Sequence, residues 1–175
     1  MEFGFHTKLG YMTLVNYRGE APCPVVPREV NGMPVRCMEE SFKDLLFITG
    51  AVLPDTMDQI GEMLFLGCDG LREFTVPEGY THIGDRAFCV CRNLHKVVLP
   101  PSVKSIGRLA FFGCESLEEI NLENVTEIAP GAFFGCKNLK KVTINPAALP
   151  LYPNVFAGTA VMSNEQLWGA GTSLR

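Results

Sequence analysis

Apolar residues recur along this chain with a period much longer than that of a helix or a strand. Phenylalanine returns at intervals of 23, 23, 23, 22 and 23 residues, at Phe42, Phe65, Phe88, Phe111, Phe133 and Phe156. A period in this range is typical of solenoids, in which each short unit buries its apolar face only by stacking on copies of itself. The pattern therefore predicts a repeat protein of about six coils.

A second alternation lies within each period, where two apolar residues stand two positions apart. These pairs are Ala51/Leu53, Phe74/Val76, Val97/Leu99, Ile120/Leu122 and Val142/Ile144. Alternation with a period of two is typical of a short strand with one buried side. We expect the strands to stack in parallel along one face, with the phenylalanine segments forming short turns on the opposite face. Glycine follows the first apolar residue of three coils, at Gly61, Gly84 and Gly107, and its conformational freedom suits a tight turn there.

The clearest unit reads Ile83-Gly84-x-x-Ala87-Phe88-x-x-Cys91-x-x-Leu94-x-x-Val97-x-Leu99-Pro100. This pattern resembles the BspA-type leucine-rich repeat, and the match covers residues 37–162. The resemblance implies a right-handed leucine-rich-repeat solenoid of about six coils of 22–23 residues. Such a fold belongs to the α/β-type repeat class, is mostly strand and short turns, and carries one parallel sheet.

The whole chain, residues 1–175, is predicted to form a single leucine-rich-repeat domain. Residues 1–36 are interpreted as an N-terminal cap, residues 37–162 as the repeats, and residues 163–175 as a C-terminal cap or tail. Terminal units of a solenoid depart from the repeat because they shield the last apolar face from water.

Composition excludes some partners. The chain carries 15 basic and 19 acidic residues, a net charge of −4, which does not favour nucleic acid or an anionic membrane surface. It contains no apolar run of the roughly 20 residues needed to cross a bilayer, so membrane insertion is not expected.

The first residues show no signal-peptide pattern. The family resemblance nevertheless implies a protein that is secreted or held at the cell surface.

Cysteines follow the repeat as well. Cys68, Cys91, Cys114 and Cys136 form one column, and thiols from successive coils would lie along a line of about 14 Å, too long for one tetrahedral zinc ion. We interpret them as buried apolar residues.

Cys23 and Cys37 could pair near the first coil, which the sequence leaves open. A metal or thiol site at Cys89, Cys91 and His95 is a further hypothesis, but no orienting acid or fourth ligand stands nearby.

The outward positions of the strands offer the candidate functional surface. They form two adjacent columns, Glu73, Lys96, Glu119 and Lys141 in the first and Thr75, Val98, Asn121 and Thr143 in the second. The charges alternate in sign, so neighbouring coils can support each other's register.

No nucleophile with both a base and an orienting group, and no cofactor motif, appears in the sequence. The main hypothesis is therefore a non-enzymatic scaffold that binds a protein partner through these eight residues, as in adhesion, with no cofactor. The alternative is a structural or spacer unit of a larger assembly, with no ligand of its own.

Overall fold

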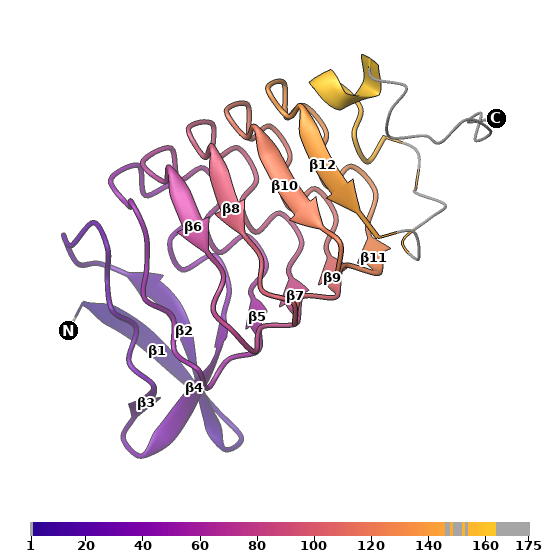
Figure 1. Cartoon of the computed structure of the whole chain (residues 1–175). Coiled ribbons are helices and arrows are strands. Elements are labelled where there is room, and N and C mark those ends of the chain that lie inside the picture. Colours follow the sequence, from indigo (N-terminus) through magenta and orange to yellow (C-terminus); the bar gives the residue numbers. More distant parts are fainter. Residues whose placement is uncertain (1, 146–147, 149–151, 153, 164–175) are drawn as a thin grey trace.

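The chain forms a solenoid whose coils stack side by side, with a separate sheet at its N-terminal end (Figure 1). This computed structural model describes residues 2–145, 148, 152 and 154–163. The predicted fold class, a leucine-rich-repeat solenoid of about six coils, is confirmed. The C-terminal cap or tail, predicted over residues 163–175, falls almost entirely outside the described residues.

The outward strands form one parallel sheet. Its members are β6 (Glu73–Thr75), β8 (Lys96–Val98), β10 (Glu119–Leu122) and β12 (Lys141–Ile144), in the order β12-β10-β8-β6. They run side by side along one face in Figure 1. Four of the five predicted strands are present. In the first coil the expected strand is only an isolated bridge, between Val52 and Val25.

A second parallel sheet lies where only turns were expected. It consists of two-residue strands, β5 (Gln59–Ile60), β7 (His82–Ile83), β9 (Ser105–Ile106) and β11 (Glu127–Ile128), in the order β11-β9-β7-β5. The prediction of one sheet was therefore incomplete. Two residues are too few to produce a visible alternation in the sequence, because each strand contributes only one buried side chain.

The N-terminal sheet packs on the first coil. It consists of β1 (Phe3–Lys8), β2 (Tyr11–Tyr17), β3 (Glu29–Val30) and β4 (Met33–Met38), in the order β1-β2-β4-β3. Ser41 donates its hydroxyl to the Leu14 carbonyl at 3.0 Å, and the ring centroids of Tyr17 and Phe42 are 5.6 Å apart. The apolar core thus continues from this sheet into the repeats.

The phenylalanine column forms a continuous stack of buried rings. Successive centroids are 5.4, 5.3, 5.2, 5.2 and 5.3 Å apart, with interplanar angles of 15° or less. Each ring is at most 3% exposed. Offset stacking at this separation is favourable for aromatic rings, and the spacing follows from the distance between adjacent hydrogen-bonded coils.

The glycines that open three coils serve a purpose different from the one predicted. Gly61, Gly84 and Gly107 are not among the residues with positive φ. A Cβ added at Gly84 would lie 2.7 Å from the Ile60 carbonyl oxygen and 2.8 Å from the Glu62 nitrogen, closer than atoms can pack. Glycine is therefore required here because the backbone of the preceding coil leaves no room for a side chain.

A short 3-10 helix, η2 (Ala160–Ser163), is the last described element. Among the described residues, no helix has the length and hydrophobicity that crossing a bilayer requires.

Candidate functional site: the outward strand face

All eight predicted face residues are exposed and come from neighbouring strands. Pairing aligns Glu73 with Lys96, Lys96 with Glu119, and Glu119 with Lys141. The strands hold them in place because the alternate residues Phe74, Val97 and Ile120 point into the core. The structure therefore brings the two predicted columns together on one surface. Whether that surface binds a partner stays a prediction.

The alternating charges are compensated unevenly. Lys141 lies 3.2 Å from the Glu119 carboxylate, and Glu73 lies 3.3 Å from Nε2 of His95. Lys96 makes no ion pair with any other residue that the structure describes, although it stands between two acidic residues in the register. The middle of the face therefore presents an ammonium group that no carboxylate of the described residues pairs with.

A groove of about 310 Å³ runs over this part of the face. Six of the eight predicted residues line it, namely Lys96, Val98, Glu119, Asn121, Lys141 and Thr143. Glu73 and Thr75 are not part of its lining. Val98 is 44% exposed and places an apolar side chain directly beside Lys96 and Asn121. The groove thus combines two ammonium groups, a carboxylate, an amide, a hydroxyl and an apolar surface.

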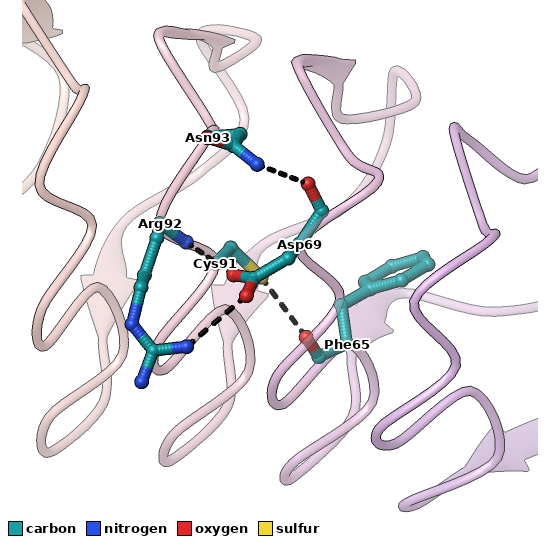
Figure 2. A network of polar contacts seen from close by, with 5 residues as sticks. All are labelled: Phe65, Asp69, Cys91, Arg92 and Asn93. Carbon is teal, nitrogen blue, oxygen red and sulfur yellow. Dashed lines mark hydrogen bonds and ion pairs between the residues drawn. The ribbon is translucent and has the colours of Figure 1, made fainter.

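The column of four cysteines forms a ladder inside the stack. Each Sγ donates to the carbonyl oxygen of the phenylalanine in the preceding coil, at 2.9 Å for Cys68, 3.0 Å for Cys91, 3.1 Å for Cys114 and 3.0 Å for Cys136. Figure 2 shows the bond from Cys91 to Phe65. All four thiols are fully buried, as predicted.

Burial also makes these thiols poor nucleophiles. It raises the pKa of Cys68 and of Cys136 to about 12, and raises the pKa of Cys91 and Cys114 well above the ordinary value. A thiolate, not a thiol, attacks electrophiles and binds metals. The ladder is therefore suited to packing and hydrogen bonding between coils.

The hypothetical metal or thiol site at Cys89, Cys91 and His95 has no supporting geometry. Cys91 bonds to the Phe65 carbonyl in the core, whereas His95 lies on the surface beside Glu73. Cys89 is buried, and burial raises its pKa. In the part of the chain that the structure describes, no group of three or more His, Cys, Asp or Glu side chains is arranged to hold a metal ion.

The pairing of Cys23 with Cys37 stays a prediction. Cys23 carries an exposed free thiol, and the side chain of Cys37 lies outside the described set.

A second column of alternating charge was not predicted from the sequence. It follows the cysteine column by one residue and runs Asp69, Arg92, Glu115 and Lys137. Asp69 accepts hydrogen bonds from the Arg92 backbone N–H at 2.9 Å and from its guanidinium at 3.1 Å, and the Asp69 carbonyl accepts from Asn93 at 2.8 Å (Figure 2). Lys137 pairs with Glu115 at 2.8 Å. These contacts join adjacent coils. The alternation of charge signs along this column is the feature of the sequence from which the contacts could have been predicted.

Comparison with known proteins agrees with this geometry. The family model described as a BspA type leucine rich repeat region matches residues 37–162 in six copies, the span that the sequence resemblance predicted. No curated protein sequence matches the chain.

Solved bacterial structures share the fold. A leucine rich cell surface protein from Faecalibacterium prausnitzii is 26% identical, with a TM-score of 0.75 over 91% of this chain. This chain covers 45% of that protein's chain, so it spans less than half of its length. A leucine rich repeat protein from T. pallidum is 22% identical, with a TM-score of 0.68, and the match covers 85% of this chain and 88% of that one.

Proposed function

The chain belongs to the BspA-type leucine-rich repeat family, and from that premise we propose that it is a non-enzymatic scaffold that binds a protein through its outward strand face. The contact surface is the groove over β8, β10 and β12, to which β8 contributes Lys96 and Val98. Glu73 and Thr75 extend this surface along β6.

One observation carries the proposal. Lys96 is exposed and makes no ion pair with another described residue, and it adjoins an apolar side chain that is 44% exposed, Val98. An ammonium group that forms no ion pair with another described residue and adjoins an exposed apolar side chain is suited to a protein partner that supplies a carboxylate and covers the apolar surface. We expect the partner to place an acidic side chain against Lys96.

We further propose that the protein acts at the cell surface or in secreted form, as an adhesion module. The F. prausnitzii relative is called a leucine rich cell surface protein, which supports this location. Since the present chain spans only 45% of that relative, the alternative of a spacer unit within a longer array also has support.

Affinity capture from the native source tests the two functions against each other. The Lys96→Glu variant is compared with the wild-type protein and with Lys8→Glu, a matched reversal on β1, outside the groove. We expect at least one captured protein to lose tenfold or more in recovery with Lys96→Glu, and to be retained with Lys8→Glu. Tenfold corresponds to about 1.4 kcal/mol of binding free energy.

The captured protein is then purified and its dissociation constant measured with each variant. Melting temperatures within a degree or two of the wild-type value establish that the variants are folded. If every captured protein binds the folded Lys96→Glu and Glu119→Lys variants as tightly as the wild type, the face is not a binding site, and the spacer function takes its place.

A further inference from the structure

A larger hollow lies on the other sheet, at its C-terminal end. Its volume is about 690 Å³, within the range of roughly 300–1,000 Å³ that is usual for small-molecule sites. Three successive coils contribute its polar lining, and a fourth adds an aromatic ring. These side chains are His82, Asp85, Ser105, Thr126, Glu127 and Tyr152.

The hollow lies where the described part of this sheet ends. Ser105 and Glu127 donate their backbone N–H groups to the preceding coil, to Thr81 and Lys104. Among the described residues, β11 is the last strand of this sheet, and the hollow opens beside it.

The polar groups along its floor are held in a fixed row. Register pairs His82 with Ser105 and Ser105 with Glu127, and Nδ1 of His82 lies 2.6 Å from the Ser105 hydroxyl. The Asp85 carboxylate is anchored by the Arg108 backbone N–H at 2.7 Å. Adjacent strands lie about 4.8 Å apart, so successive side chains in the row are separated by a distance comparable to the length of one sugar ring.

The chemistry of the lining selects among ligands. Its described residues offer two carboxylates, three hydroxyls and an imidazole, and none of them is Lys or Arg. Carboxylates accept hydrogen bonds and repel anions, so a ligand rich in O–H donors and without negative charge fits best. Tyr152 is 60% exposed and offers an aromatic face on which the C–H side of a sugar ring can pack.

We propose that this hollow binds a neutral oligosaccharide, with its hydroxyls on the row of His82, Ser105 and Glu127 and one ring against Tyr152. This site lies on a different sheet from the outward strand face. The two activities are therefore separable, and one can fail while the other holds.

Calorimetric titration and a panel of immobilised glycans test the proposal on the purified full chain. The probes are maltotetraose, cellotetraose, chitotetraose and other neutral glycans, with tetragalacturonic acid as the acidic counterpart and penta-arginine as the cationic one. We expect at least one neutral glycan to bind and tetragalacturonic acid not to bind. Glu127→Gln and Tyr152→Ala should each weaken binding tenfold or more.

The matched control is Glu123→Gln, which changes an exposed carboxylate that does not line the hollow. Both Glu123→Gln and Lys96→Glu should bind the glycan like the wild type. If no neutral glycan in the panel binds, or if binding is unaffected by both lining variants in folded protein, the proposal is overturned. Binding of penta-arginine that depends on Glu127, with no glycan binding, would overturn it in favour of a cationic peptide.

Discussion

Each coil uses two residues in the left-handed backbone conformation, on either side of its phenylalanine. They stand two positions before and two positions after the ring in all six coils; those after it are Asp44, Gly67, Val90, Gly113, Gly135 and Gly158. In the first five coils the N–H groups of these later residues donate to the next coil, as when Val90 donates to Phe112 at 2.7 Å. Valine is branched at Cβ and is rarely found with positive φ, so Val90, with φ of 61°, is strained.

Val90→Gly is therefore expected to stabilise the protein by about 1 kcal/mol. The reciprocal change, Gly113→Val, places valine at the equivalent position of the next coil, where φ is 68° and a Cβ meets no atom closer than 4.0 Å. It should destabilise the protein by a similar amount through backbone strain. Urea denaturation of both variants measures the two effects, and equal midpoints for the wild type and both variants would contradict this interpretation.

At the scale of the element, the cysteine ladder joins coils through bonds that require protonated thiols. Because burial raises the pKa of Cys68 to about 12 from an ordinary value of 9.0, the native thiol keeps its proton over a range in which the unfolded thiol loses it. Its contribution to stability is complete below pH 9 and decreases as the pH rises toward 12. The same direction holds for Cys91, Cys114 and Cys136.

We therefore expect the free energy of unfolding to fall steeply above about pH 9, by roughly 1.4 kcal/mol per pH unit for each buried thiol. Burial also raises the pKa of Tyr80, which adds to the loss. Cys114→Ala should have a shallower slope than the wild type by one thiol's share. Urea denaturation at several pH values up to 11 measures both slopes, and identical slopes would show that the ladder does not couple to proton release.

Elements differ in how far the sequence predicts them. The strands β6, β8, β10 and β12 were predictable because each carries two apolar residues on alternate positions, whereas the two-residue strands such as β7 leave no such trace. The candidate face was predictable as a column of alternating charge. The absence of an ion pair at Lys96 among the described residues was not predictable. Whether Glu119 pairs with Lys141 or with Lys96 depends on side-chain conformations, which the alternation of charges does not determine.

At the scale of the whole molecule, the hollow beside β11 could not be predicted from the sequence either. Its lining comes from residues as far apart as His82 and Tyr152, and no motif in the sequence joins them. What the sequence does predict is the stacking itself, because one column of phenylalanines specifies both the number of coils and the direction of the core. Both proposed surfaces depend on that stacking, since each draws its residues from several successive coils.

Native-state hydrogen exchange at the phenylalanine amides tests this stacking most directly. The N–H groups of Phe65, Phe88 and Phe111 donate to Ala87, Ala110 and Ala132 of the next coil, each at 2.8 Å. We expect these three amides to exchange slowly and with similar opening free energies, because they open only when neighbouring coils separate. Exchange at the rate of an unfolded chain in these coils, while the N-terminal sheet stays protected, would contradict the stacked array.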